Sequence, residues 1–140
     1  MPVERPKAIR KQLSRNDTGE TGGHQAGIVV PREPQVLRFF PSLDAKEYNP
    51  RHSLVFRDEV GGKWTFSFIY YNNKLFGGTR NEYRLTRMTQ FIRAHNLRAG
   101  DTLILSRDAD NRFNITFERL EETDDDDRLT IGTTWKVIEF

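Results

Sequence analysis

Asn72–Thr86, with the sequence NNKLFGGTRNEYRLT, joins a flexible turn to a run of hydrogen-bonding side chains. Gly77 and Gly78 give the backbone freedom to reverse or to approach another surface closely, because they have no Cβ. Residues 79–84 then form a strand-like segment: its arginines can fork onto guanine, its asparagine onto adenine, and its glutamate can accept from cytosine. The stretch predicts an arm that enters a DNA major groove. The alternative is a solvated strand edge with alternating charges, which composition alone favours.

A second polar stretch lies earlier, at Leu13–Gly27, LSRNDTGETGGHQAG. It contains four glycines, one arginine, one histidine and almost nothing apolar. A polar loop of this length is usually functional or disordered rather than a simple connection. We therefore consider the two stretches together.

Together they resemble the N-terminal DNA-binding domain of EcoRII-type restriction endonucleases. The matching motifs are Ser14 followed by NDTG at 16–19, TGGHQ at 21–25, and TRNE at 79–82 followed by Arg84. The resemblance implies a mainly β fold, a seven-stranded DNA-binding pseudobarrel like that of plant transcription factors, with a short helix at each end. Residues 13–27 would form its N-arm and residues 77–84 its C-arm, two loops that grip DNA.

The resemblance also implies roles for individual side chains. Arg80 would contact a guanine with two bonds, Glu82 would accept from cytosine amino groups, and Arg84 would read a second guanine or clamp a phosphate. Asn81 would touch a base edge or order the C-arm, and His24 would read a base from the N-arm. Residues implied to contact the DNA backbone or to order the arms are Lys11, Arg15, Asn16, Asp17, Thr18, Gln25, Lys74, Thr79, Tyr83 and Arg87.

The chain departs from the family pattern at two positions of the C-arm. Gly78 and Tyr83 stand where relatives can carry lysines, so the arm has fewer positive charges with which to anchor phosphates. Lys74 could supply the anchoring instead, and a changed target sequence also remains open.

The implied function is sequence-specific binding of double-stranded DNA at a CC(A/T)GG-like site. In such enzymes this effector domain stimulates or licenses cleavage by a separate catalytic nuclease domain of the same polypeptide. By this resemblance the chain itself would hold no catalytic site and no cofactor, magnesium would act in the catalytic domain, and the location would be the prokaryotic cytoplasm. Two alternatives remain open: a self-contained metal-dependent nuclease and a single-strand nucleic-acid binder.

The composition is that of one domain at residues 7–140 after a loose end at residues 1–6. The chain has 140 residues, 36% of them hydrophobic, with ten Phe and two Trp to fill a small barrel. It has no cysteine for a disulfide or a thiolate zinc site, and no apolar run long enough to span a membrane. Residues 118–140 hold 3 basic and 8 acidic side chains, and residues 1–117 hold 19 and 12. This asymmetry suggests a cationic face for a polyanion.

Alternation and turn signals predict seven or eight short strands and two short helices, typical of a closed or nearly closed barrel. Residues 7–13 form a first strand or a frayed lead-in, and residues 97–105 a turn that leads into a strand. The other strands are expected at 27–31, 52–57, 63–71, 80–85, 112–118 and, to finish the sheet, 129–131 and 134–140, with helices at 33–40 and from Thr86 or Thr89 to His95. Trp64, Phe66, Phe68 and Tyr70 share one strand face, which favours core packing over stacking on bases. Residues 124–127 form a solvated acidic turn.

Evidence for catalysis is weak. Asp44-Ala-Lys46 has the acidic-x-Lys form of metal-dependent nucleases, but three letters match often by chance in a chain with 30% charged residues. His52 and His95 fit a strand start and a helix end, and the three histidines are not spaced as metal ligands.

Overall fold

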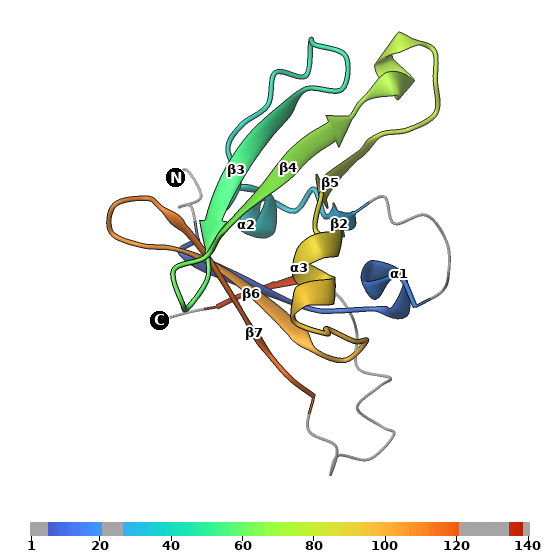
Figure 1. Ribbon diagram of the computed structural model, residues 1–140. Coiled ribbons are helices and arrows are strands. Elements are labelled where there is room, and N and C mark those ends of the chain that lie inside the picture. Colours follow the sequence, from blue (N-terminus) through green and yellow to red (C-terminus); the bar gives the residue numbers. More distant parts are fainter. Residues whose placement is uncertain (1–5, 21–26, 121–134, 139–140) are drawn as a thin grey trace.

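One twisted sheet of eight strands makes up most of the computed structural model, which describes residues 6–20, 27–120 and 135–138 (Figure 1). The strands run in the order β2-β5-β4-β3-β7-β6-β1-β8. Neighbouring strands are antiparallel, except that β3 and β7 pair in parallel at Phe56 and Phe113. The strands are β1 (Ala8–Gln12), β2 (Ile28–Val30), β3 (Arg51–Arg57), β4 (Lys63–Tyr71), β5 (Glu82–Thr86), β6 (Thr102–Arg107), β7 (Phe113–Glu118) and β8 (Trp135–Val137).

The two edge strands of this sheet meet, which nearly closes it into a barrel. The indole Nε1 of Trp135 on β8 donates to the carbonyl oxygen of Val29 on β2 at 2.8 Å. A strand edge left open would expose unpaired backbone groups. This bond is therefore the seam of the pseudobarrel.

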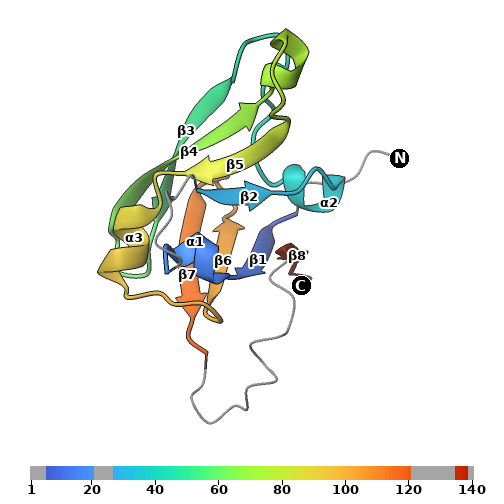
Figure 2. The ribbon, with the colours of Figure 1, turned by 90° about the vertical axis from the view of Figure 1, so that its right-hand side faces the viewer.

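Three short α-helices and one 3-10 helix lie between the strands: α1 (Arg15–Thr18), α2 (Pro34–Leu37), α3 (Thr89–Ala94) and η1 (Asn73–Phe76). Figure 2 shows α2 and α3 at opposite ends of the antiparallel β2–β5 pair. Among the described residues, none of the helices has the length and apolar character needed to cross a membrane.

The core lies inside the barrel and is filled mainly by aromatic rings. On β4, Phe66 and Phe68 are each 1% exposed, and Phe68 stacks on Phe40 with ring centroids 4.5 Å apart. Burial of one such side chain contributes about 1.5–3 kcal/mol. Trp64 is half-buried and meets Phe91 of α3 edge-to-face at 5.1 Å. The core interpretation of the aromatic stripe is confirmed, and its rings are not free to stack on single-stranded bases.

The predicted fold class is confirmed, with differences in detail. The described part of the chain has eight strands, within the seven or eight expected from alternation and one more than the seven that the resemblance implies. It has three α-helices rather than two, because α1 has no apolar spacing from which it could be predicted. The predicted cap of α3 was wrong: Met88 is the N-cap without a side-chain bond, Thr89 is already helical, and Thr86 ends β5. The expected strand at 129–131, the acidic turn at 124–127 and residues 1–5 lie outside the described residues.

Candidate nucleic-acid interface

Hydrogen bonds hold the loop between β4 and β5, which carries the C-arm. Asn72 is fully buried, and its side-chain amide donates to the carbonyl oxygens of Ala45 at 3.0 Å and Glu47 at 2.6 Å. The backbone N–H of Arg80 donates to Asn73 Oδ1 at 2.6 Å, and Lys74 N–H donates to the Arg80 carbonyl at 2.9 Å. The arm therefore begins from a braced base rather than from a free loop.

Glycine is required where η1 ends in this loop. Gly77 has a φ of 94°, a left-handed conformation in which a side chain would be strained, and it closes the 3-10 turn. A Cβ there would meet no atom within 4 Å, so backbone conformation rather than space accounts for the glycine.

A row of three charged side chains lies on one face at the start of β5. Arg80 Nη2 is 2.9 Å and Arg84 Nε is 3.2 Å from the same oxygen of Glu82, Oε1. The Arg80 guanidinium also lies 3.9 Å from the centroid of the Tyr71 ring, a cation–π contact. Arg80, Glu82 and Arg84 are 40%, 30% and 16% exposed, so the row is positioned yet accessible at one end.

The charge of Glu82 is fixed by its neighbours. Burial tends to raise the pKa of its carboxyl group, but hydrogen bonds and charges from Arg84 and Arg80 outweigh burial and hold the pKa below its usual value. Glu82 is therefore a carboxylate at neutral pH and acts only as a hydrogen-bond acceptor.

The N-arm joins the sheet beside this row. Ile28 and Val29 of β2 pair with Leu85 and Arg84 of β5, and Arg84 Nη1 donates to the Gly27 carbonyl at 3.2 Å. Gly27 has a φ of 89°, and a Cβ at this position would collide with the Leu85 carbonyl. The end of the predicted N-arm and the strand that carries the predicted base-reading residues of the C-arm thus lie side by side.

The start of the N-arm is anchored by a helix cap and an ion pair. Asp17 N–H donates to Ser14 Oγ at 3.1 Å and Ser14 N–H donates to Asp17 Oδ2 at 3.0 Å, a capping box that sets α1. Lys11 Nζ donates to the same carboxylate, and both residues are buried. Of the two roles predicted for Lys11, DNA-backbone contact or ordering of the arm, this burial favours ordering of the arm.

The family model described as "Restriction endonuclease EcoRII, N-terminal" matches residues 6–127. The chain belongs to this EcoRII N-terminal family. It is 39% identical over 100 residues to the type II restriction enzyme EcoRII of Escherichia coli, covering 68% of this chain and 24% of that enzyme. A putative B3 domain-containing protein of Oryza sativa subsp. japonica is 32% identical over 116 residues, covering 82% of this chain and 35% of its own length. The chain thus spans about a quarter to a third of these two relatives.

The fold of this EcoRII N-terminal family member is also found in plants. The structure of the Arabidopsis FUS3–DNA complex matches with a TM-score of 0.62 and 23% identity, covering 80% of this chain and 96% of that one. This match independently supports the pseudobarrel fold.

Two residues of the predicted C-arm site, Asn81 and Tyr83, make contacts with side chains of neighbouring elements that hold the arm in place. Asn81 Oδ1 accepts from the Tyr70 hydroxyl at 2.6 Å, and the Asn81 carbonyl accepts from Arg32 Nη2 at 2.6 Å. Tyr83 stacks on Tyr70 with ring centroids 4.3 Å apart, on the face of β5 opposite Arg84. Both contacts fit arm ordering.

Of the remaining predicted residues, six are described by the structure and two are not. Lys74, Thr79, Arg87, Arg15 and Asn16 are exposed, while the half-buried Thr18 donates to the Arg15 carbonyl and to Glu20. His24 and Gln25 lie outside the described residues, so their predicted contacts stay predictions.

Sequence reasoning missed Arg51 on β3. The register places Arg51 opposite Ile69, Ile69 opposite Arg84, and Arg84 opposite Val29, so these four residues form one cross-strand row on the same face. Arg51 is exposed and extends the cationic face across the sheet. The signal was the strand alternation itself, which puts Arg51 on the face opposite the buried Leu54 and Phe56.

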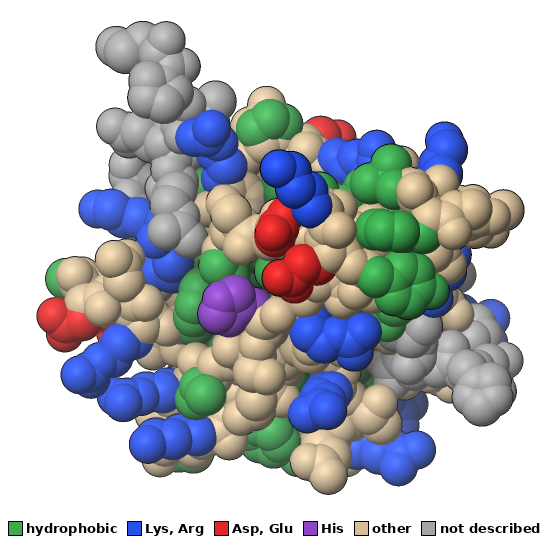
Figure 3. Space-filling view, turned by 90° about the horizontal axis from the view of Figure 1, so that it is seen from above, with side chains coloured by type: hydrophobic (Ala, Val, Ile, Leu, Met, Phe, Trp, Pro, Cys, Tyr) green, Lys and Arg blue, Asp and Glu red, His purple; other side chains and the backbone are tan. Residues whose placement is uncertain are grey.

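The tip of the β4–β5 loop carries an apolar cluster that sequence reasoning also missed. Leu75, Phe76 and Tyr48 are 62%, 52% and 61% exposed, and Tyr48 meets Phe76 edge-to-face at 5.4 Å. Viewed from above, hydrophobic side chains gather on this end of the molecule, with Lys and Arg side chains distributed around them (Figure 3).

The segment considered for nuclease chemistry forms a local turn. Asp44 Oδ1 accepts from the backbone N–H of Lys46 at 2.9 Å, and both residues are exposed. Within the described ranges, no group of three or more His, Cys, Asp or Glu side chains is placed to hold a metal ion. The turn geometry accounts for this motif without catalysis.

Proposed function

We propose that this chain is a sequence-specific binding domain for double-stranded DNA, which reads a CC(A/T)GG-like site in the major groove through its two arms. The observation that carries the proposal is the Arg80–Glu82–Arg84 row, in which one carboxylate holds two guanidinium groups in fixed positions. Family membership and the likeness to FUS3 in its DNA complex support the same conclusion.

The chemistry of the row matches neighbouring C·G pairs. Guanine offers O6 and N7 as acceptors for an arginine fork, and cytosine offers its amino group to a carboxylate. Since Arg80 Nη2 and Arg84 Nε both contact Glu82 Oε1, they lie at most about 6 Å from one another, a range that includes the ~3.4 Å spacing of adjacent base pairs. The two guanidinium groups could therefore reach guanines on adjacent base pairs, as a GG step requires.

Exposed cations around the row would supply the phosphate contacts. Lys74 and Arg87 flank the C-arm, Arg51 lies on the same face two strands away from β5, and Arg15 lies at the start of the N-arm. Phosphate contacts fix the register of a protein on the duplex, while base contacts specify the sequence. This division of labour assigns sequence reading to the Arg80–Glu82–Arg84 row and the phosphate contacts to the cations around it.

The coupling to cleavage completes the proposal. EcoRII is a restriction enzyme about four times longer than the matched segment, so a catalytic nuclease domain in the same polypeptide, with its magnesium, would act on DNA when this effector domain is occupied. A location in the bacterial cytoplasm belongs to the same proposal, because the matched enzyme is that of Escherichia coli.

Selection of bound duplexes from a random pool, at stated salt, tests the function directly. We expect enrichment of a CC(A/T)GG-like site, with an affinity at least ~10³-fold above that for random duplex. Arg80→Ala should cost about 1–3 kcal/mol on the selected site and blunt discrimination. Arg112→Ala, an exposed arginine in the β6–β7 turn, is the matched control.

Three results would contradict the proposal. Equal loss by Arg80→Ala on the selected site and on random duplex would remove base reading. Preference for single-stranded over duplex oligonucleotides would support the single-strand binder. Cleavage of plasmid by the purified chain with magnesium would support the self-contained nuclease.

A further inference from the structure

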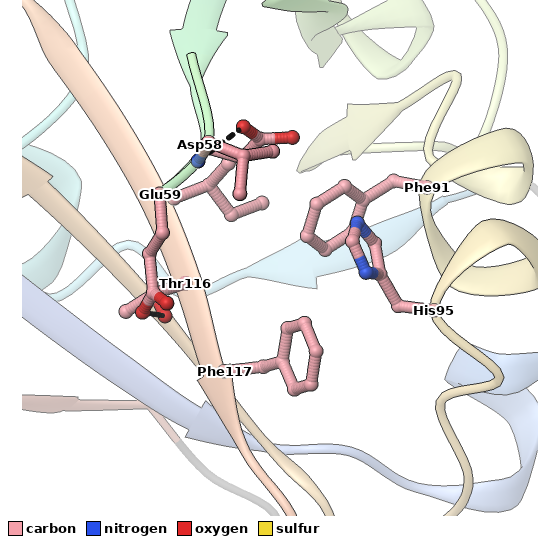
Figure 4. Close-up of a pocket in the computed structure, with 8 residues that line it drawn as sticks. Asp58, Glu59, Phe91, His95, Thr116 and Phe117 are labelled. Atoms are coloured by element: carbon pink, nitrogen blue, oxygen red, sulfur yellow. Dashed lines mark hydrogen bonds between the residues drawn. The ribbon is translucent and has the colours of Figure 1, made fainter. Parts of the chain in front are cut away.

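A pocket of about 140 Å³ lies at the far end of β4 from the C-arm. Its walls come from the turn after β3, from α3 and from β7 (Figure 4). Because β4 has nine residues at roughly 3.3 Å each, the pocket lies about 25 Å from the charged row. Nothing in the proposed DNA contacts uses it. A cavity of roughly 150 Å³ is large enough for a benzene-sized group.

Aromatic rings form one side of this pocket. Phe91 and His95, one helical turn apart on α3, have ring centroids 4.5 Å apart, and Phe117 of β7 lies 5.0 Å from His95. The Nε2 atom of His95 is buried and has no hydrogen-bond partner among the described residues. The Phe117 ring already attracts one guanidinium, that of Arg119 at 5.1 Å, although Arg119 is not part of the lining.

Two carboxylates stand on the opposite side, and hydrogen bonds fix both of them. Asp58 accepts from the indole N–H of Trp64 at 2.9 Å and from the backbone N–H groups of Val60 and Gly62 at 3.0 and 2.7 Å. The Trp64 hydrogen bond is the main cause of a lowered Asp58 pKa. Glu59 accepts from the Thr116 hydroxyl.

Among the residues that the structure describes, no Lys or Arg side chain lines the pocket. The aromatic rings and the carboxylates favour a cation that donates hydrogen bonds, and the carboxylates repel phosphate. We propose that this pocket binds the guanidinium group of an arginine side chain presented by a protein partner. A guanidinium is planar, stacks on aromatic rings and forks onto carboxylates, which an ammonium cannot do as well. This docking site is independent of the proposed DNA contacts.

Titration of the ¹⁵N-labelled chain with Nα-acetyl-arginine amide, followed by NMR, tests the proposal. We expect saturable shifts at Phe91, His95, Phe117 and Glu59, with a Kd on the order of 1 mM for a single side chain. Nα-acetyl-citrulline amide has nearly the same shape without the charge and should bind at least ~10-fold more weakly.

Two matched variants distinguish binding of the probe in the pocket from a general effect of the protein's net charge. Glu59→Gln keeps an oxygen that can accept from the Thr116 hydroxyl. It should raise the Kd of the arginine probe by about 2- to 5-fold. Glu47→Gln removes the same charge from the exposed 42–50 loop and should leave probe binding unchanged. Neither variant should reduce the preference for the selected duplex. An unchanged preference would show that the fold and the arms of the variant are intact.

Several outcomes would overturn the inference. Equal shifts with the citrulline probe would show an apolar pocket, and tighter binding of tetramethylammonium than of the arginine probe would show a site for small organic cations. Shifts of the same resonances with protein concentration alone, accompanied by a change in sedimentation, would show that a second copy of the chain fills the pocket.

Discussion

Replacement of Glu82 by glutamine should move the affinities for the target site and for random duplex in opposite directions. The variant keeps the shape and one acceptor oxygen of the side chain, but it removes the negative charge between Arg80 and Arg84. If Glu82 accepts from a cytosine amino group as proposed, loss of the carboxylate should cost about 1–3 kcal/mol of discrimination, or about 5- to 150-fold. Removal of one negative charge about 4 Å from a phosphate would strengthen non-specific binding by about 1 kcal/mol at low salt.

Fluorescence anisotropy with the selected duplex and a scrambled duplex, at two salt concentrations, measures both effects. The two dissociation constants should converge, and the gain on scrambled duplex should shrink as salt screens the added charge. Glu47→Gln makes the same charge change on an exposed loop and should strengthen both complexes equally, if at all. An equal shift of both affinities in Glu82→Gln would refute base reading by Glu82.

Four further outcomes follow from the structure. Lys11→Met should lower the free energy of unfolding by about 3–5 kcal/mol in urea titrations, because it leaves the Asp17 carboxylate buried without its partner; Asp17→Asn in the same chain should recover part of this loss. The pKa of Glu82 is lowered on folding, so its stabilisation is complete above its ordinary value of 4.5 and is lost as pH falls through the folded-state pKa; the contribution of Glu82 to site preference, measured as the difference between the chain and Glu82→Gln, should not change from about pH 8 to 5. Arg51→Ala should reduce the slope of log K against log salt by about 0.9 without altering the selected sequence, and a changed sequence would show that it reads a base. Trp135→Phe removes one buried hydrogen bond and should cost about 1–1.5 kcal/mol in thermal unfolding, whereas an unchanged Tm would show that the seam bond is dispensable.

The sheet could be predicted because its strands carry strong alternation. The alternation of Phe66 and Phe68 predicts the inner face of β4, and the residues that follow Gly78 predict the charged face of β5. The same rule applied to β1 would have placed Lys11 inward, between the buried Ile9 and Leu13, instead of at a phosphate. The period-two pattern assigns Lys11 to the inner face of β1, although its charge argued for an exposed position.

The short elements and long-range contacts were harder to foresee. Helix α1 has no apolar face, and only the Ser14–Asp17 spacing of a capping box pointed to it. The pairing of β2 with β5, which brings Arg84 to Gly27, joins residues 57 positions apart and has no local signature. The pocket beside His95 likewise combines segments from three parts of the chain.

The seam formed by Trp135 has a practical consequence for where the chain can be shortened. The family match ends at residue 127, before β8, so a fragment cut at that boundary would lose the strand that covers β1 and the indole that caps β2. Two unprotected strand borders would then be available for pairing with other molecules, which is a common route to aggregation. Insolubility of such a fragment would reflect an unsealed sheet rather than any defect in the two arms that are proposed to contact DNA.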